Sequence, residues 1–143
     1  MRDIKYIAIH CSASKPSMTV DIERIRKWHL KRGFSDVGYH FYIRQDGRIE
    51  LGRPIERTGA HVKGYNSVSI GVCYEGGVDE HMKATDTRTV KQIDTMYTLL
   101  KVLGSLYPKA KIQGHKDFPA VNKACPSFDV KEWCELNNIN HNR

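Results

Sequence analysis

The order of apolar and polar positions along the chain first predicts strands. Short apolar runs typical of buried strands occupy residues 4–10, 67–77 and 110–114. Residues 38–52 contain two further strand-like runs on either side of Asp46-Gly47, a dipeptide that strongly favours a tight hairpin turn. The pattern therefore predicts a sheet that includes one β-hairpin.

Apolar residues also recur at helical spacing in three segments. These segments are about residues 20–32, about residues 86–107 and residues 129–136. Thr19 and Asp129 are the expected N-caps of the first and last helix, because their side-chain oxygens can accept from free N–H groups of a first turn. Together the elements predict a mixed α/β fold with a central mixed β-sheet flanked by helices.

The length of 143 residues suits one domain with its own core, so residues 1–143 are expected to form a single domain. Hydrophobic residues make up 40% and charged residues 27%, which argues against a disordered or fibrous protein. No run approaches the roughly 20 apolar residues of a membrane span, and Asp3 and Lys5 interrupt the apolar region that a signal peptide needs. We expect a monomer that is synthesised in the cytoplasm without a signal peptide and does not insert into membranes.

The formal net charge of +7 favours polyanionic partners such as nucleic acid, phospholipid surfaces or anionic wall polymers. The basic residues are dispersed along the chain and are not gathered in one arm, which favours a solvated basic surface. Charge therefore indicates a class of partner without identifying one.

The four cysteines form no CxxC pair and no framework typical of a small secreted protein. Most of them are therefore expected to be reduced. Cys73 lies inside an apolar run and is expected to be a small buried residue, and Cys134 has no evident partner.

Two histidines and one cysteine lie where predicted strands give way to loops. His10 ends the first strand, His115 follows the last, and Cys125 lies in the loop beyond it. Strand ends of one sheet commonly converge at one edge, so these side chains could meet. Two imidazoles and a thiolate are donors that zinc prefers, and three protein ligands leave a fourth position for water, as in catalytic sites. The residues alone leave open the alternative that these are hydrogen-bonded or surface side chains.

Four segments, in this order, carry a resemblance to a known family: AIHCSASKPS, RKWHLKRGFSDVGYHFYIRQDGRIELGR, GAHVKGYNSVSIGVCYEGG and GHKDFPAVNKACPSFDV. Together they resemble the zinc-dependent N-acetylmuramoyl-L-alanine amidases of the bacteriophage T7 lysozyme type, the amidase-2 family, which is related to the peptidoglycan recognition proteins. Several blocks that match in register are more specific than any single motif. The resemblance implies the single-domain fold of these proteins.

The resemblance also implies an activity and its residues. It implies that His10, His115 and Cys125 are the ligands of a Zn²⁺ cofactor, and that the substrate is the amide between N-acetylmuramic acid and L-alanine in peptidoglycan. Tyr39 matches the family tyrosine near the metal-bound water, and Lys123 matches the catalytic lysine of this subfamily. A fixed ammonium beside a metal can stabilise the oxyanion that forms when an amide carbonyl is attacked. The expected role is cell lysis of the phage or prophage type, on the cell wall after release.

Other polar residues near these motifs are expected to act less directly. The resemblance places substrate contacts near His61 and Asn66, so both are candidate substrate-binding residues. His40 follows Tyr39 in a strand and must face the opposite side, so it is expected to be structural or to support the site indirectly. Cys11 adjoins a ligand and is expected to point away from it.

The sequence leaves three other functions open. The first is a peptidoglycan binder without catalysis, which has no need of a metal-competent set of residues. The second is a protein that also binds an RNA polymerase, a partner about which the motifs say nothing. The third is a cysteine hydrolase with Cys11 as nucleophile and His10 or His40 as base.

Overall fold

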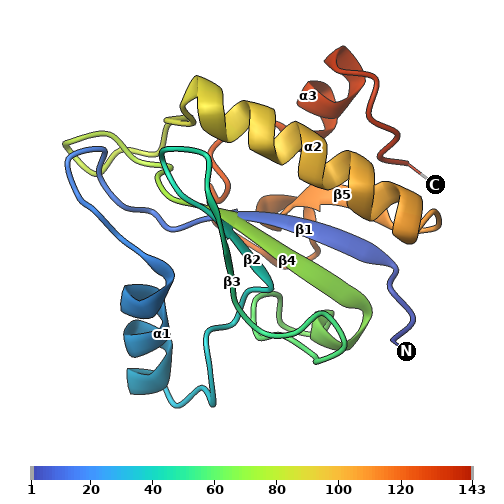
Figure 1. Cartoon of the computed structure of the whole chain (residues 1–143), viewed down its shortest axis with the longest axis horizontal. Coiled ribbons are helices and arrows are strands. Elements are labelled where there is room, and N and C mark those ends of the chain that lie inside the picture. Colours follow the sequence, from blue (N-terminus) through green and yellow to red (C-terminus); the bar gives the residue numbers. More distant parts are fainter. Residues whose placement is uncertain (1, 143) are drawn as a thin grey trace.

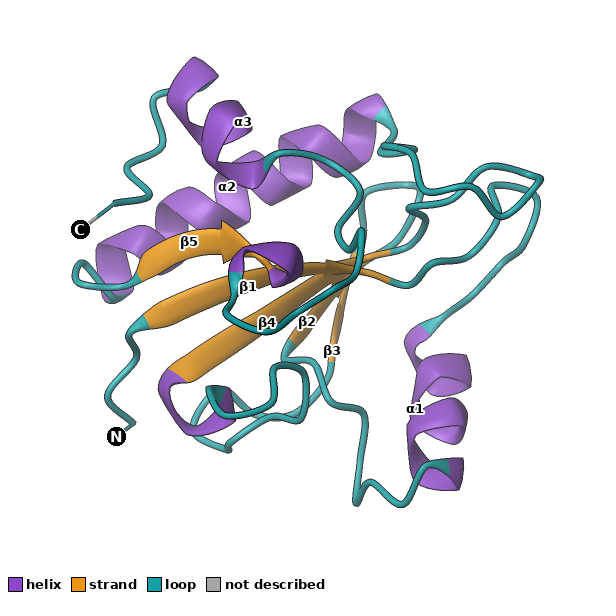
Figure 2. Cartoon of the chain, turned by 180° about the vertical axis from the view of Figure 1, so that it is seen from behind, coloured by secondary structure: helices purple, strands orange, loops and turns teal. Residues whose placement is uncertain are grey.

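The computed structural model of the protein describes residues 2–142 (Figures 1 and 2). Two 3-10 turns, η1 (Asn66–Val68) and η2 (His115–Asp117), accompany the helices and strands. The helices and strands follow in the order β1 (Tyr6–Cys11), α1 (Ile22–Lys31), β2 (Phe41–Ile43), β3 (Ile49–Leu51), β4 (Ser69–Tyr74), α2 (Val90–Leu106), β5 (Lys111–Gly114) and α3 (Val130–Leu136).

The sheet is mixed, as predicted. Its strand order is β3-β2-β4-β1-β5. β1 pairs in parallel with both β4 and β5, β2 pairs in parallel with β4, and β3 is antiparallel to β2. The antiparallel pair is the hairpin that Asp46-Gly47 predicts, and Gly47 has a φ of +88°, which favours glycine.

Side chains of alternate residues divide the sheet into two faces. On one face, Ile7 and Ile9 of β1 pack in the main core with residues of α2 and α3, the two helices that Figure 1 shows on that side of the sheet. On the other face, Ala8 packs with Val62 and Phe118, and α1 lies on this side (Figure 2). His10 has the same parity as Ala8, so β1 presents it on the face opposite α2.

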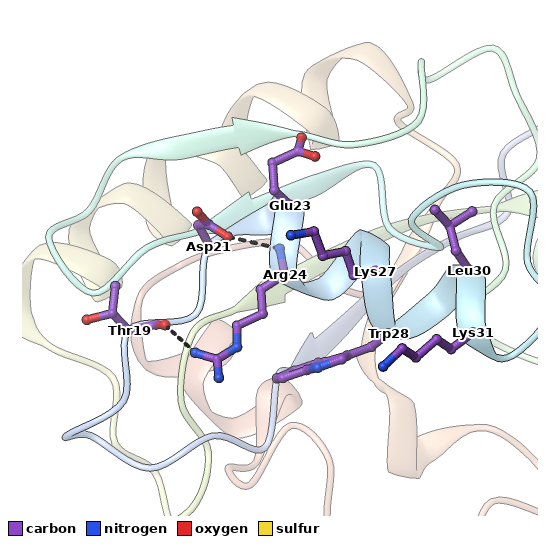
Figure 3. A pocket seen from close by; sticks show the side chains of 8 residues that line it. All are labelled: Thr19, Asp21, Glu23, Arg24, Lys27, Trp28, Leu30 and Lys31. Carbon is purple, nitrogen blue, oxygen red and sulfur yellow. Dashed lines mark hydrogen bonds between the residues drawn. The ribbon is translucent and has the colours of Figure 1, made fainter.

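Helix α1 begins later than the sequence predicts, and the prediction of Thr19 as its N-cap is wrong. Asp21 is the N-cap, because its side chain accepts a 2.9 Å hydrogen bond from the Arg24 N–H, while the Thr19 main-chain oxygen accepts from the Arg24 side chain (Figure 3). Val20 is fully buried and anchors the preceding segment, so the backbone stays extended up to Asp21.

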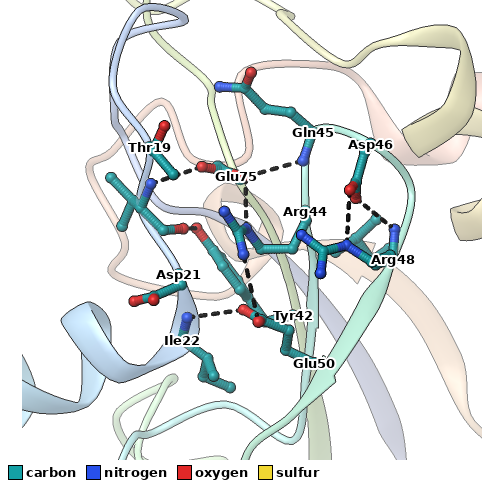
Figure 4. A network of polar contacts seen from close by, with 12 residues as sticks. Thr19, Asp21, Ile22, Tyr42, Arg44, Gln45, Asp46, Arg48, Glu50 and Glu75 are labelled. Atoms are coloured by element: carbon teal, nitrogen blue, oxygen red, sulfur yellow. Dashed lines mark hydrogen bonds and ion pairs between the residues drawn. The ribbon is translucent and has the colours of Figure 1, made fainter.

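A buried carboxylate at the end of β4 provides this anchor (Figure 4). Glu75 is only 2% exposed and accepts hydrogen bonds from the Val20 N–H at 2.7 Å and from Arg44 Nε at 2.9 Å. Glu50 on β3 pairs with the same Arg44 and accepts from the Ile22 N–H at 2.9 Å. The start of α1 is thus fixed to the β2–β3 hairpin and to β4 by charged groups.

Helix α2 also starts later than the predicted residue 86. Thr89 and Gln92 form a reciprocal capping box that sets the first turn. Asp86 instead pairs with Arg88 in the segment before the helix. Asp129 caps α3 as predicted, accepting from the Glu132 N–H at 3.1 Å. None of the helices described between residues 2 and 142 combines the length and the hydropathy that a membrane span needs.

Candidate metal centre

The structure brings the three predicted metal ligands together. The side-chain donor atoms of His10, His115 and Cys125 all lie within 4.8 Å of one another. His10 Nδ1 is 3.9 Å from Cys125 Sγ, and the rings of His10 and His115 have their centroids 4.6 Å apart. His10 is 1% exposed, whereas the other two are partly accessible. Two nitrogen donors and one sulfur donor with an accessible side match a metal site with an open position.

The loop that carries Cys125 is held on both sides. The Lys116 N–H donates to the Cys125 carbonyl at 2.9 Å, which closes the loop on η2. The Tyr74 hydroxyl at the end of β4 donates to the Pro126 carbonyl at 2.6 Å, and Ser127 Oγ donates to the Gly77 carbonyl at 2.7 Å. These bonds fix the position of the thiol relative to the strand ends.

Arg88 fastens the same region from the side of α3. Its guanidinium carbon lies 3.5 Å from the Phe128 ring centroid and 4.8 Å from that of Trp133, and the group pairs with Asp86 at 3.0 Å. Stacking of arginine on aromatic faces is favourable when the cation is shielded from water. The segment after Cys125 is thus tied to the segment before α2.

The Cys11 side chain packs in the main core with Ile7 and Ile9, on the face of β1 opposite His10, whereas its main chain contacts the centre. Its main-chain N–H donates to Cys125 Sγ at 3.2 Å, and its own Sγ lies 4.0 Å from Ser127 Oγ. A Cβ at position 77 would lie 2.4 Å from Cys11 Sγ, so the close packing here requires Gly77. The neighbouring Cys11 thiol and burial raise the pKa of Cys125, and this main-chain donor acts in the opposite direction and favours the thiolate, the form that binds metal.

The three donors line a cleft of about 500 Å³. None of the described residues that line it is acidic, and Arg32, Lys63 and Lys123 contribute positive charge. Burial lowers the pKa of His10 and of His115, and the nearby Lys123 ammonium lowers both further. The imidazoles are therefore neutral at pH 7, the state in which they can act as ligands.

Both predicted catalytic residues reach this cleft. The Tyr39 ring lies 5.1 Å from the His10 ring, measured between centroids. Burial raises the pKa of Tyr39 well above its ordinary value, so its hydroxyl stays a hydrogen-bond donor. Lys123 is exposed where it lines the cleft. The structure thus provides a neutral donor and an exposed cation around the three ligand atoms.

The two candidate substrate-binding residues lie in the cleft wall and also make internal bonds. His61 Nδ1 is 2.9 Å from His10 Nε2, and His61 Nε2 is 3.2 Å from Ser69 Oγ. Asn66 Oδ1 accepts from the N–H groups of His61 and Val62, both at 2.8 Å. Burial lowers the pKa of His61 to about 3. Their contacts within the protein thus hold the wall together.

Two other histidines have distinct positions. His40 accepts from the Gly71 N–H at 3.0 Å and lies 2.8 Å from the Arg57 carbonyl, so it is structural, as expected. His29 lines the cleft from α1, and its Nδ1 accepts from the Gly38 N–H at 2.8 Å. No motif in the sequence pointed to His29 as a residue of the cleft.

A second hollow, on the outer face of α1, is larger at about 680 Å³ but lacks such chemistry (Figure 3). Arg24, Lys27 and Lys31 surround the partly exposed ring of Trp28 there. The hollow contains none of the clustered histidine and cysteine donors. The cleft above His10 is therefore the site that can support catalysis.

Comparisons with known proteins agree with this geometry. Residues 1–128 match the Amidase_2 family, described as N-acetylmuramoyl-L-alanine amidase. The chain is 45% identical over 133 residues to the endolysin of Escherichia phage T7, covering 93% of this chain and 87% of the relative. It is likewise 45% identical over 131 residues to the endolysin of Enterobacteria phage K11, covering 92% and 85%. The N-acetylmuramoyl-L-alanine amidase LysC from Clostridium intestinale URNW superposes with a TM-score of 0.82 at 29% identity, covering 97% of this chain and 88% of that one.

Proposed function

The chain belongs to the Amidase_2 family and is an N-acetylmuramoyl-L-alanine amidase that degrades peptidoglycan, and from this premise we propose that its activity depends on one zinc ion held by His10, His115 and Cys125. The observation that carries the proposal is the convergence of their donor atoms within 4.8 Å in the cleft. Two imidazoles and one thiolate are a typical zinc set with a fourth position left open. The Cys11 N–H supports the thiolate form of Cys125.

When bound, zinc supplies a Lewis acid and lowers the pKa of a coordinated water to about 7. The side chains around it then have separate tasks. The Lys123 ammonium stabilises negative charge that develops on the oxygen of the attacked amide. The protonated Tyr39 hydroxyl donates a hydrogen bond to the reacting group or to the water. Both residues line the cleft that holds the donors.

The reaction adds water across the amide between N-acetylmuramic acid and L-alanine. The lactyl group of the sugar ends as a carboxylate, and the proton passes to the departing L-alanine amine. His61 and Asn66 contact the substrate from the cleft wall in this proposal. A cleft lining without acidic residues suits a substrate that carries carboxylates.

The proposed biological role is lysis of the host wall of the phage or prophage type, after release of the protein to the wall. The similarity to endolysins supports this role. A purely binding function is disfavoured because Tyr39 and Lys123 accompany a complete donor set. Binding to an RNA polymerase and a monomeric state stay predictions.

Mass spectrometry of digested cell walls tests this function. We expect peptides that begin with a free L-alanine amine, together with glycan strands that carry free lactyl carboxylates. A chelator should abolish their release, and added zinc should restore it. His115→Ala should be inactive, whereas His81→Ala, which changes an exposed histidine outside the cleft, should be active. Cleavage at a glycosidic or peptide bond, or clearing that is insensitive to chelator, would contradict the proposal.

A further inference from the structure

We propose that His61 and Ser69 form an uncharged hydrogen-bonded relay that fixes the tautomer and orientation of His10. In this proposal His61 is a positioning residue for the metal centre in addition to being part of the cleft wall. The inference deepens the proposed function and rests on His10 being a ligand. Its physical basis is the direction in which each ring nitrogen of His10 points.

The two nitrogens of His10 face different partners. Nδ1 lies 3.9 Å from Cys125 Sγ, on the side of the three donors, whereas Nε2 lies 2.9 Å from His61 Nδ1. A neutral imidazole has one N–H and one lone pair. For Nδ1 to offer its lone pair to a metal, Nε2 must carry the hydrogen and donate it to His61 Nδ1. Such an outward hydrogen bond from a ligand histidine sets its tautomer and its basicity.

The same rule carries the relay one step further. Once His61 Nδ1 accepts from His10, the hydrogen of His61 must be on Nε2, which lies 3.2 Å from Ser69 Oγ. Ser69 is fully buried at the start of β4, so its hydroxyl is held in place and can accept this bond. The order of donors and acceptors is thus fixed from the sheet to the metal centre.

The His61 ring itself has little freedom to turn. Asn66 Oδ1 accepts from the His61 N–H and fixes its backbone. A Cβ at Gly71 would lie 2.8 Å from the ring, and a Cβ at Gly59 would also lie 2.8 Å from it. Glycine at these two positions therefore makes a slot that holds the His61 ring in a T-shaped arrangement with the His10 ring, whose plane is at 87° to it.

The relay differs in charge from the common arrangement in which a carboxylate accepts from the ligand histidine. Besides His10, the ring next to His61 is that of His40, and the groups that lower the pKa of His61 after burial are all basic: His40, His115, Arg2 and Arg53. The thiolate of Cys125 is then the single anionic group among the proposed ligands and their partners. A less negative ligand environment leaves a bound metal more electrophilic.

Two variants separate the relay from a role in packing or substrate contact. His61→Leu removes the acceptor for His10, whereas His61→Asn keeps an oxygen near the position of Nδ1. We expect His61→Leu to weaken zinc binding by about 10–100-fold, measured by competition with a chromophoric chelator. His61→Asn should restore most of that loss. Circular dichroism spectra and thermal unfolding check that both variants fold.

A second readout does not depend on zinc or on activity. Two-bond ¹⁵N–¹H correlation spectra of the metal-free protein report which ring nitrogen of His10 carries the hydrogen. We expect the Nε2–H tautomer in the wild type and in His61→Asn, and a mixture of tautomers in His61→Leu. If His61→Leu keeps both the tautomer and the zinc affinity of the wild type, the relay is refuted, even if amidase activity falls. A wild type that binds no zinc but shows the Nε2–H tautomer would refute the proposed function and leave the relay standing.

Discussion

Replacing Glu75 with glutamine tests how the start of α1 is fixed to the sheet. One carboxylate oxygen of Glu75 accepts from Arg44 Nε and from the Gln45 N–H, both at 2.9 Å, and the other accepts from the Val20 N–H at 2.7 Å (Figure 4). Glutamine keeps a single acceptor oxygen and places an NH₂ group against a donor. It also removes the negative charge that faces the largely buried Arg44.

The size of the effect follows from these contacts. A hydrogen bond to a charged group contributes about 1.5–3 kcal/mol, and breaking a buried ion pair costs about 3–5 kcal/mol. Glu50 still pairs with Arg44 at 3.4 Å and offsets part of that cost. We therefore expect the free energy of unfolding to fall by about 2–4 kcal/mol.

Urea denaturation followed by circular dichroism measures this change. With an m-value of about 2 kcal/mol/M, the midpoint should fall by about 1–2 M in Glu75→Gln. Asp94→Asn, the same chemical change on the exposed side of α2, should stay within about 0.5 kcal/mol of the wild type. Equal midpoints for the two variants would refute the reasoning that the buried carboxylate anchors α1.

Three further predictions concern the cleft and its supports. Burial, with the charges of nearby arginines, lowers the pKa of His29 to about 4. The unfolded chain therefore binds more protons than the folded chain between pH 6.5 and 4, and stability must fall as the pH drops through this window. His29→Gln should reduce that fall by about 1–3 kcal/mol, and an equal loss of stability between pH 7 and 4.5 in the wild type and the variant, measured by urea denaturation, would contradict this. Arg88→Ala removes the guanidinium from the Phe128 ring and should lower the free energy of unfolding by about 1–3 kcal/mol. An unchanged melting temperature would argue against a stabilising role of this stacking. Lys123→Ala should lower kcat by about 10²–10³-fold with zinc content unchanged, whereas Lys116→Ala, in η2, should leave kcat near the wild-type value. Equal kcat values for the two variants would show that Lys123 has no role in catalysis.

The fold could be predicted well where local signals decide it. The apolar runs and Asp46-Gly47 specify strands and a hairpin from neighbouring residues alone, and the mixed sheet follows. The start of α1 could not be predicted in this way. Thr19 and Asp21 are both good caps, and the choice between them depends on Glu75, which is distant in sequence and binds Val20.

The site shows the same division. His10, His115 and Cys125 are candidates because they lie where predicted strands give way to loops, and the family resemblance selects them. Their supports depend on contacts that no motif carries. The packing of the Cys11 side chain requires Gly77 on a different loop, and the contact between His61 and His10 requires Gly71 beneath the ring. Such contacts join residues that are distant in sequence, so they can be identified only once the register of the strands is known.

Elemental analysis of the purified protein tests the central claim most directly. The account predicts one zinc ion per wild-type chain. Cys125→Ser should retain little zinc while it stays folded, and Cys134→Ala, which changes a buried thiol in the main core, should retain the metal. A wild-type protein that releases L-alanine peptides from walls while it contains no zinc would contradict the account.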